Sequence, residues 1–501
     1  MYKNLVIVGG GTAGWIAASM LSRPWNGPAP NVTLVESPNI ERVGVGESSI
    51  PSLRRLISTL RIDEKDFMQR CQATYKCSLH LVDWRRETGS KSGRTDYYHP
   101  LFRWGEDQPE WFREWLHARA HEDHEEDFDF SCFAGAHLAN ERRSPKTAIG
   151  DDHSTTLQYA YHLDAALFAE YLAEWSTARG VTRVLANVTN VGMTESGDIS
   201  HVSTDTAGDL HGDLFIDCTG FRGLLINGAL NVPFESYQDT LFCDAAVAIS
   251  TFKPEPLHEI PCETRATAMD AGWIWDIPLR HRHGCGYVYS SRHLSTDEAE
   301  AELRRHLNGL EQSDARHIRM RVGRNQHIWK RNCVSVGLSA GFVEPLESTS
   351  IFCIQNGVAE LLRVLREDTP MDRRRDKYNH LMGDLIDGIR DFVAAHYYLS
   401  DRNDTDFWRA NRADERLPDS LVEILDAWRA GDDIDSLLQA HGSSRVVSPA
   451  SWYCVFAGSG VLPNRVARRS ETTLTKVVQR GREARSLARD AADHGRVLAA
   501  V

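Results

Sequence analysis

The amino-terminal part of the chain carries three glycines at a spacing that suits the binding of a dinucleotide. Gly9, Gly11 and Gly14 directly follow a short apolar run, residues 5–8. In such a loop the first glycine permits a tight turn, the second lets the backbone approach a pyrophosphate, and the third lets the following helix pack against the strand. The spacing therefore predicts a dinucleotide site, and a glycine turn in another α/β unit is the alternative.

The residues after these glycines strengthen this interpretation. A helix is expected from about Thr12, and its first N–H groups, including that of Ala13, would face the phosphates. Glu36 ends a second apolar run, residues 32–35, about 20 residues beyond the glycines. Its carboxylate is placed to accept hydrogen bonds from an adenosine ribose.

A second glycine pair lies in a loop that also carries a carboxylate. Gly44 and Gly46 precede Glu47, and two serines follow. This composition suits a loop that lies against a flat cofactor or its ribityl chain. A simple turn is the alternative that the spacing leaves open.

Lys76 is a candidate for chemistry only if its surroundings are buried. Residues 73–84 alternate between apolar and polar types, as in a single β-strand. Lys76 would lie on the polar face with Thr74, Ser78 and His80. That face could contact solvent or line a cavity, and most lysines are solvated.

A carboxylate lies beside the start of an apolar helix further along the chain. Apolar residues recur every three or four positions from Ile351 to Leu365, with Ser348 or Thr349 as the expected N-cap. Free N–H groups at a helix start make an anion site. Glu347 could accept a proton there, and a surface or helix-dipole role is the alternative.

The elements that would position these residues follow an α/β pattern. The run 214–216, closing on Asp217, is expected to return to the nucleotide sheet, so the nucleotide fold is interrupted by an insertion and resumed. Residues 160–172 predict an amphipathic helix with Leu163, Leu167 and Leu172 on one face. Residues 272–289 predict a hairpin with Trp273, Trp275 and Ile277 on one strand face.

The carboxyl-terminal part predicts mainly helices beyond about residue 370, ending in an exposed, frayed amphipathic helix. Aromatic residues between 96 and 130 could line a pocket, although core packing explains most of them. The acidic and histidine run 121–127 predicts a solvated charged face, and we expect no metal site.

The composition narrows the class of protein. A net charge of −13 and an isoelectric point near 5.9 argue against nucleic acid or an anionic membrane as partner. The ten cysteines include no CxxC pair. No apolar run approaches the roughly 18 residues that span a bilayer, and the first strand leaves no room for a signal peptide. We expect a soluble cytoplasmic protein.

Together these features resemble the flavin-dependent halogenases of the tryptophan halogenase group over nearly the full chain. The markers are residues 9–15, Gly44-Val-Gly-Glu47, Lys76, Trp273-x-Trp275-x-Ile277-Pro278 and Phe342-Val-Glu-Pro-Leu-Glu-Ser-Thr349. The dinucleotide loop alone would fit many oxidoreductases. The tryptophan signature, the lysine and the Leu-Glu-Ser-Thr run together are specific.

The resemblance implies an α/β fold, in which an FAD-binding Rossmann-like domain of the aromatic hydroxylase or glutathione reductase type contains an inserted β-sheet. Residues 1–370 would form this domain, with inserted substrate-side segments at about 85–150 and 225–325. Residues 371–501 would form a mainly helical lobe that covers the substrate site. A monomer or homodimer is expected.

The resemblance also implies the reaction. Reduced FAD, supplied by a separate flavin reductase, would react with oxygen to a flavin hydroperoxide, which chloride or bromide attacks to yield hypohalous acid. Lys76 would donate a hydrogen bond to this acid or form a haloamine with it, and so deliver halogen to an arene. Glu347 would stabilise the cationic ring and remove its proton, with Ser348 helping to orient it. The Trp273 and Trp275 wall would separate flavin from substrate.

The resemblance assigns further contacts residue by residue. The halide would lie at Thr349 and Ser350, and the arene between His99, Phe102, Trp452 and Tyr453. The predicted cofactor contacts are Gly9, Gly11, Thr12, Ala13, Gly14, Glu36, Gly46, Glu47, Val188, Asp217, Gly337, Leu346 and Ile351.

Two departures from the family pattern leave the substrate and the halide open. The family usually has glycine where Ser350 stands, so a preference for bromide is one hypothesis. No full clamp for an amino acid is evident, so free indole or another small arene is at least as plausible as tryptophan. A flavin-dependent aromatic monooxygenase and a non-catalytic flavin-binding protein are the alternative functions.

Overall fold

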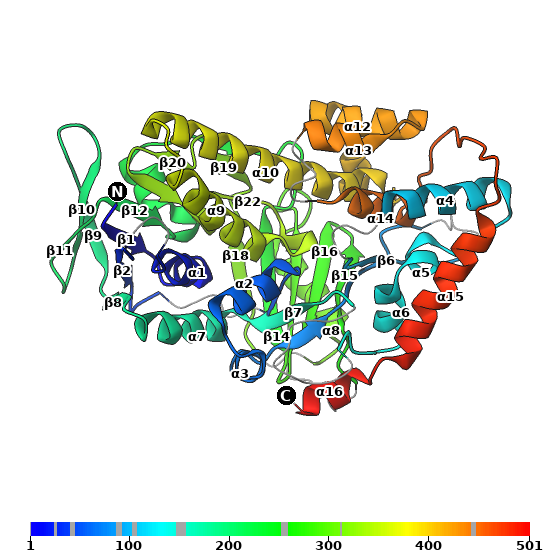
Figure 1. Ribbon diagram of the computed structural model, residues 1–501, viewed down its shortest axis with the longest axis horizontal. Helices are drawn as coiled ribbons and strands as arrows, with labels where there is room; N and C mark the ends of the chain where they lie inside the picture. The colour runs from blue at the N-terminus through cyan, green and yellow to red at the C-terminus, as the bar shows by residue number, and fades with distance from the viewer. Residues whose placement is uncertain are drawn as a thin grey trace.

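The computed structural model describes residues 2–24, 28–40, 46–86, 93–102, 108–146, 157–251, 259–310, 313–441 and 447–500. Gly44, which belongs to the loop predicted to lie against the cofactor, is outside these ranges. Figure 1 shows the nucleotide-binding sheet with α1 towards one end of the molecule and α4, α5 and α15 at the other, with the long helix α10 running between them.

A six-stranded sheet forms the nucleotide-binding half, in the order β20-β21-β12-β1-β2-β8. Strand β1 pairs in parallel with β2 on one side and β12 on the other, so the predicted return to this sheet is confirmed. The strands are β1 Asn4–Val8, β2 Asn31–Glu36, β8 Thr182–Leu185, β12 Leu214–Asp217, β20 Trp329–Lys330 and β21 Cys333–Ser335.

A seven-stranded sheet is inserted into this fold, in the order β18-β14-β17-β16-β15-β5-β6. Its antiparallel β16–β17 pair is the predicted tryptophan hairpin. The strands are β5 Ser78–Val82, β6 Tyr97–Pro100, β14 Ala245–Thr251, β15 Glu263–Met269, β16 Gly272–Pro278, β17 His283–Tyr289 and β18 Arg316–Arg319.

Three small sheets complete the β-structure of the described residues. Among them the sheet β3-β7-β4 lies beside the site described below. The strands are β3 Gly46–Ser48, β4 Thr74–Lys76 and β7 Ala160–Asp164 in one sheet, β9 Val188–Met193, β10 Ile199–Thr204 and β11 Asp209–His211 in the second, and β13 Phe234–Ser236, β19 Gly323–Asn325 and β22 Gly341–Phe342 in the third.

The single strand predicted for residues 73–84 is wrong, because the chain changes sheets in its middle. Strand β4 pairs with β7, whereas β5 pairs with β15 and β6. Between them the N–H of Cys77 donates to the carbonyl of Cys262 at 2.8 Å. Alternation persists across the break, and the polar face is buried, with only 2% of Lys76 exposed.

The helix predicted for residues 160–172 begins later than expected. Residues 160–164 form β7, and α7 spans Ala165–Thr177. The reason is the Asp164 side chain, which accepts hydrogen bonds from the N–H groups of Ala166 and Leu167 as the N-cap. Leu163 is therefore a buried strand residue, and Leu167 is exposed.

Helices dominate the chain after residue 370, as predicted. The helices are α1 Thr12–Leu21, α2 Ser52–Leu60, α3 Glu64–Arg70, α4 Gln108–His121, α5 Phe128–Cys132, α6 Ala134–Asn140, α8 Thr296–Leu307, α9 Ser350–Leu365, α10 Met371–Leu399, α11 Asp406–Asn411, α12 Asp419–Ala430, α13 Ile434–Ala440, α14 Pro449–Gly458, α15 Leu474–Asp490 and α16 His494–Ala500, besides α7. Across the described ranges, no helix combines the length and apolar character that crossing a bilayer requires.

The carboxyl-terminal end is not the exposed single helix that the sequence predicted. It forms two helices, and α15 packs against α4, α5 and α6. Its inward face carries small and apolar residues, among them Val477, Ala484 and Ala488, which are buried. The predicted domain boundary at residue 370 falls between α9 and α10, which pack on each other.

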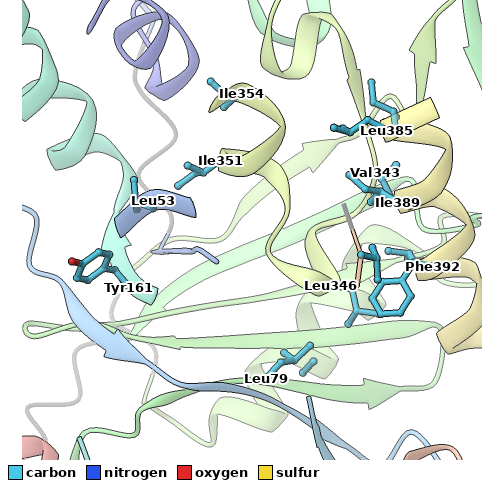
Figure 2. Packing of buried hydrophobic residues seen from close by; sticks show 14 of the residues in the cluster. Leu53, Leu79, Tyr161, Val343, Leu346, Ile351, Ile354, Leu385, Ile389 and Phe392 are labelled. Atoms are coloured by element: carbon cyan, nitrogen blue, oxygen red, sulfur yellow. The ribbon is translucent and has the colours of Figure 1, made fainter. Parts of the chain in front are cut away.

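The main core holds the segment between β22 and α9 in place. Figure 2 shows Leu346 beside Phe392 of α10, and Ile351 on the first turn of α9. Both Leu346 and Ile351 are almost fully buried. Because they flank residues 347–350, this short segment is anchored at both ends.

Candidate active site

A cavity of about 620 Å³ lies where the glycine loop, the tryptophan strand and the start of α9 meet. This volume is typical of a pocket for a small molecule or cofactor. Ten of the residues predicted to contact cofactor, halide or catalytic groups line it, namely Gly11, Thr12, Ala13, Gly46, Glu47, Gly337, Ser348, Thr349, Ser350 and Ile351.

The glycine loop has the geometry that close approach of a cofactor requires. Gly9 has a φ of +114°, and a Cβ there would lie 2.2 Å from the carbonyl oxygen of Cys218. Gly11 lines the cavity, and a Cβ there would meet nothing within 4 Å. Gly14 lies against the carbonyl of Gly9, as helix–strand packing demands. This loop and the open N-terminus of α1 fit a dinucleotide such as FAD.

Glu36 lies at the end of β2 against the same loop. A Cβ at Gly10 would overlap its carboxylate oxygen at 1.6 Å. The buried carboxylate also accepts a hydrogen bond from Nε of Arg183. The residue is therefore held beside the loop, at the place where a ribose would lie.

Six predicted cofactor contacts do not line the cavity. Gly9, Gly14 and Glu36 belong to the glycine loop or lie against it, as described above, and the other three lie elsewhere. Asp217 is fully buried, and its carboxylate accepts N–H groups of Thr219, Leu225 and Ile226. Leu346 packs in the core. Val188 lies on β9, in a sheet of its own with β10 and β11.

Another part of the cavity wall is formed by the tryptophan strand. Trp273, Trp275 and Ile277 of β16 all line the cavity, so the prediction that they share one strand face is confirmed. Glu47 lies in the same cavity, and removal from bulk water raises the pKa of its carboxyl to about 7.

The strand β4 and the turn before α9 bring Lys76 and Ser348 together. Nζ of Lys76 donates a hydrogen bond of 2.9 Å to Oγ of Ser348, although 272 residues separate them. Burial lowers the pKa of the Lys76 ammonium to about 8, against the opposing effect of the Glu347 charge. Since Ser348 lines the cavity and Lys76 does not, one hydrogen bond links the cavity to the lysine.

Ser348 has a backbone conformation that is rare for a residue with a side chain. Its φ of 59° and ψ of 34° place it in the left-handed region. Such conformations cost on the order of 1 kcal/mol and concentrate at functional sites. Here the turn lets the Ser348 hydroxyl face both Lys76 and Oγ of Ser48, each at 2.9 Å.

Glu347 is buried between two imidazoles. Its Oε2 lies 2.8 Å from Nδ1 of His99, and its Oε1 lies 2.8 Å from Nε2 of His396. Burial alone would raise the pKa of this carboxyl, but the two imidazoles hold it well below its usual range. Glu347 is therefore an ionised carboxylate.

His396 was not predicted from the sequence, because no motif marks it in the last turn of α10. Its Nδ1 lies 2.8 Å from the carbonyl of Phe392, and its Nε2 faces the Glu347 carboxylate. Both partners only accept, so both ring nitrogens carry hydrogen. The imidazolium of His396 thus neutralises the buried charge of Glu347.

The predicted substrate residues separate into two places. The rings of His99 and Phe102 lie 5.7 Å apart, and Phe392 lies 6.1 Å from His99 and 5.0 Å from Trp452. Because His99 contacts Glu347 directly, this aromatic cluster lies beside the Glu347 carboxylate. The buried Nε1 of Trp452 has no hydrogen-bond partner among the described residues.

Tyr453 is not brought to this cluster. It stacks on Phe112 at 4.3 Å and donates a hydrogen bond to Asp435. Successive residues of an α-helix point about 100° apart, so Trp452 and Tyr453 face different neighbours. The position of Tyr453 indicates a packing role between α4, α13 and α14.

The predicted halide residues stand at the start of α9. Thr349 is the N-cap, and its side chain accepts no capping hydrogen bond. Ser350 is the first residue of the helix, and both residues line the cavity. The first N–H groups of α9 are thus at the cavity wall, where they can bind an anion.

The acidic and histidine run 121–127 is not the solvated face that was predicted, because His124 is buried beside Ser131 and other members of the run contact the protein. Glu122 accepts the N–H groups of Thr473 and Leu474, and Glu126 pairs with Arg485. Elsewhere in the described part of the chain, His201, Asp209 and His211 bring ligand atoms within 4.8 Å of one another, with Asp209 and His211 exposed on β11.

A second buried carboxyl, which the sequence did not single out, supports the tryptophan wall. Oε2 of Glu344 accepts hydrogen bonds from Nε1 of Trp273 at 2.9 Å and from the hydroxyl of Tyr397 at 2.8 Å. Burial raises the pKa of Glu344 to about 7. Through these two hydrogen bonds Glu344 links strand β16 to helix α10.

The comparisons with known proteins agree along nearly the whole chain. The family model for tryptophan halogenases matches residues 4–474. Tryptophan 6-halogenase SttH of Streptomyces toxytricini is 40% identical over 484 residues, which cover 92% of this chain and 90% of that protein. Tryptophan 7-halogenase RebH of Lentzea aerocolonigenes is 37% identical over 487 residues, with coverage of 92% and 90%.

Comparison with solved structures supports membership of the same family. The crystal structure of SttH superposes with a TM-score of 0.88 at 38% identity and covers 100% of both chains. The flavin-dependent halogenase Xcc4156 of Xanthomonas campestris superposes with a TM-score of 0.88 at 34% identity, over 100% of this chain and 98% of that one. The chain therefore belongs to the tryptophan halogenase family and is a flavin-dependent halogenase.

Proposed function

We propose that this chain forms hypohalous acid from halide with reduced FAD and oxygen, and that it delivers the halogen through Lys76 to an electron-rich arene of the indole or tryptophan type. The observation that carries the proposal is the buried Lys76 ammonium, 2.9 Å from Ser348 Oγ at the wall of the cavity. A solvated surface lysine would have no such partner.

The residues of the cavity would hold FAD at its two ends. The glycine loop and the N-terminus of α1 would bind the pyrophosphate, and Glu36 the ribose. Glu47, Gly46 and Gly337 line the part of the cavity between loop and tryptophan strand. When bound, and reduced by a separate flavin reductase, FAD would activate molecular oxygen, which supplies the oxidising equivalent that turns halide into hypohalous acid.

The start of α9 would hold the halide. Its N–H groups at Thr349 and Ser350 reach the cavity and offer the positive end of the helix dipole. Ser348 lies next to them and bonds to Lys76. Hypohalous acid formed at this wall is therefore one residue away from the serine that contacts the lysine.

Lys76 and Glu347 would then have different roles in the reaction of the arene. The strand β4 fixes Lys76, so the position of the arene against it decides which carbon is halogenated. The ionised Glu347 stabilises the cationic ring and accepts its proton. An arene cation is a strong acid, so a carboxylate with a depressed pKa still suffices as the base.

The arene would lie in the aromatic cluster of His99, Phe102 and Trp452, next to Glu347. The names of SttH and RebH give tryptophan as their substrate. The unpartnered Nε1 of Trp452 offers a hydrogen-bond donor inside this cluster. We include free indole with tryptophan, because indole needs no binding of an ammonium and carboxylate.

A reconstituted assay tests the proposal. The full chain is supplied with reduced FAD, oxygen, and bromide or chloride, and products from indole and tryptophan are read by mass spectrometry. Halogenated product is expected from the wild type, at least 100-fold less from Lys76→Ala, and an unchanged yield from Lys330→Ala, an exposed lysine on β20. Hydroxylated product formed without halide would instead show a monooxygenase.

A further inference from the structure

The three-stranded sheet β9-β10-β11 projects from the end of the molecule that holds the nucleotide-binding sheet (Figure 1). Its base is tied to that sheet at two strands. The side chain of Asn332 forms two hydrogen bonds with the backbone of Ile199, and Asp213 accepts N–H groups at the start of β1. His201 and His211 each lie two residues away from one of these anchors, so they mark the base of the projecting sheet.

This sheet has one buried and one accessible face. Val202 of β10 and Leu210 of β11 are paired and pack in a core cluster with residues of β1 and β12. Because side chains alternate along a strand, His201, Asp209 and His211 share the opposite face. There Asp209 and His211 are exposed and His201 is half-buried, so an ion from solvent can reach all three.

The two histidines stand directly across from each other. The register pairs His201 with His211, and their ring centroids are 5.1 Å apart. Asp209 lies two residues before His211 on the same strand, and its Oδ2 is 3.6 Å from Nε2 of His201. One ligand atom of each residue therefore lies within 4.8 Å of the other two.

The ring of His201 is positioned by its neighbours. It lies over Gly192 of β9, where a Cβ would be 2.1 Å from the ring, so a side chain there would displace it. Its Nδ1 lies 2.9 Å from Oγ of Ser200. When Nδ1 donates its hydrogen to this oxygen, the lone pair is at Nε2, the nitrogen that faces Asp209. Histidines that bind metals commonly have such a partner on the second ring nitrogen.

We propose that His201, Asp209 and His211 bind a divalent transition-metal ion, with Zn²⁺ as the best match, at the base of the sheet β9-β10-β11. The inference is independent of the proposed function, because none of the three residues lines the 620 Å³ cavity. The site would hold a structural metal rather than take part in halogenation.

The distances suit a tetrahedral ion. Zn²⁺ binds histidine nitrogen and carboxylate oxygen at about 2.0–2.2 Å, which places two ligand atoms about 3.4 Å apart. The 3.6 Å between His201 and Asp209 already has this length. Since Asp209 and His211 are exposed, rotation of their side chains closes the longer separations, and water fills the fourth position.

The ligand types select the class of metal. Two imidazoles and one carboxylate match Zn²⁺, Ni²⁺ and Cu²⁺, which bind imidazole well. Mg²⁺ and Ca²⁺ prefer sets of six or more oxygen atoms, many of them from carboxylates, carbonyls and water. The site should therefore bind Cu²⁺ more tightly than Zn²⁺, and it should not bind Mg²⁺ at comparable concentrations.

A bound ion would connect β10 to β11 beside the anchored base. Any local opening that separates these two strands would then have to release the metal. Binding to the closed form alone makes opening rarer by the factor 1 + [Zn²⁺]/Kd. The metal would thus stabilise the junction between the projecting sheet and the nucleotide-binding sheet.

Calorimetric titration with zinc chloride tests the binding. The full chain is purified without a polyhistidine tag, freed of metal with a chelator and dialysed. We expect the wild type to bind one Zn²⁺ that His211→Ala binds at least tenfold more weakly, because even the loss of a supporting partner costs about 10–100-fold in metal affinity. Asp209→Asn should also weaken the binding, and it decides the matter if His211→Ala does not fold.

His380→Ala is the matched control. His380 is exposed on α10 and lies 3.4 Å from Asp384, so it offers one histidine and one carboxylate. No third ligand completes a group there among the described residues. The Zn²⁺ affinity of this variant should equal that of the wild type.

Hydrogen exchange read by mass spectrometry measures the structural effect. At a Zn²⁺ concentration of 100 times Kd, exchange through local opening of β10 and β11 should slow about 100-fold in the wild type. The same Zn²⁺ concentration should leave exchange in His211→Ala unchanged. Peptides of α10 should exchange equally with and without the metal.

The remaining outcomes would overturn the proposal. Equal Zn²⁺ binding by the wild type, His211→Ala and Asp209→Asn would show that the ion binds elsewhere. Displacement of Zn²⁺ by an equal concentration of Mg²⁺ would show unspecific attraction to negative charge. Binding without slower exchange in β10 and β11 would show that the ion does not connect these strands.

Discussion

Nε2 of His396 donates a hydrogen bond of 2.8 Å to Oε1 of Glu347, and it thereby links the longest described helix to the segment before α9. The interaction is fully buried on the histidine side. Together with His99 it explains how Glu347 stays ionised at a place where burial alone would favour the neutral acid. The carboxylate that we propose as the base is therefore kept ionised by its neighbours.

Replacing His396 by leucine should weaken both activity and stability at neutral pH. The variant leaves the Glu347 carboxylate with one imidazole, and the loss of one partner of a buried pair costs about 3 kcal/mol. The pKa of Glu347 is depressed in the folded state, so this stabilisation is present above the unfolded value near 4.3 and is lost as pH falls. Urea unfolding at pH 7 and pH 4 measures the difference, which should shrink at pH 4.

The control lies on the same helix. His380 is exposed and forms an ion pair of 3.4 Å with Asp384. His380→Leu should change the free energy of unfolding by less than about 0.5 kcal/mol at either pH. Equal effects of the two substitutions at pH 7 would show that His396 does not support the Glu347 charge.

The part of the fold that local spacing determines could be predicted from the sequence. The glycine loop, β1, α1 and β2 follow from a few neighbouring residues, because tight turns and helix starts need particular residue types. The tryptophan hairpin is equally local. The helix predicted for residues 160–172 was partly wrong, because an apolar strand and an apolar helix start have similar sequences. Only the recognition of Asp164 as the N-cap separates them.

The surroundings of Lys76 could not be predicted, because its hydrogen-bond partner Ser348 lies 272 residues further along the chain. Ser48 and Ser348 each look like ordinary polar residues in their local context. Alternation in β4 and β5 is also the same whether the polar face meets water or a second sheet. Only the resemblance to a family pointed to the lysine, and it gave no reason for His396.

The carboxyl of Glu344 predicts an unusual dependence of stability on pH. Its folded-state pKa of about 7 lies above the unfolded value. A raised carboxyl pKa stabilises the fold fully below the unfolded pKa, and this contribution is lost as pH rises through 7. Glu344→Gln keeps an acceptor for Trp273 and Tyr397 but does not ionise.

Urea unfolding at pH 5 and pH 8 checks this expectation. The wild type should lose about 2 kcal/mol more than Glu344→Gln between these two values. Glu47 and Glu263, whose pKa values burial also raises to about 7, contribute the same pH dependence to both proteins and cancel in the comparison. An identical loss in the two proteins would contradict the assignment of Glu344.

Ser350 predicts a change in halide preference. Its side chain stands at the first position of α9, where the family usually has glycine and where the N–H donors face the cavity. Bromide gives up hydration more easily than chloride, so a hydroxymethyl group that crowds the donors should penalise chloride more. Ser350→Gly should lower the ratio of brominated to chlorinated product about threefold, which is about 0.7 kcal/mol.

Competition between equimolar bromide and chloride measures that ratio by mass spectrometry. Ser52→Gly is the matched control, because Ser52 is the first residue of α2. Its ratio should equal that of the wild type. A wild type that chlorinates as well as it brominates would remove the basis of the hypothesis.

Gly9 and Gly11 predict opposite consequences of the same added methyl group. At Gly9 the methyl would lie 2.2 Å from the carbonyl oxygen of Cys218 in a backbone with φ of +114°, so Gly9→Ala should lower the free energy of unfolding by about 2–3 kcal/mol. At Gly11 it would meet no protein atom within 4 Å, and the backbone is extended, so stability without cofactor should be unchanged. The methyl would instead occupy the cavity where a pyrophosphate approaches, and FAD affinity should fall at least tenfold, as flavin fluorescence titration would measure. Because Gly11→Ala separates binding from folding, an unchanged affinity in a folded variant would place the cofactor elsewhere.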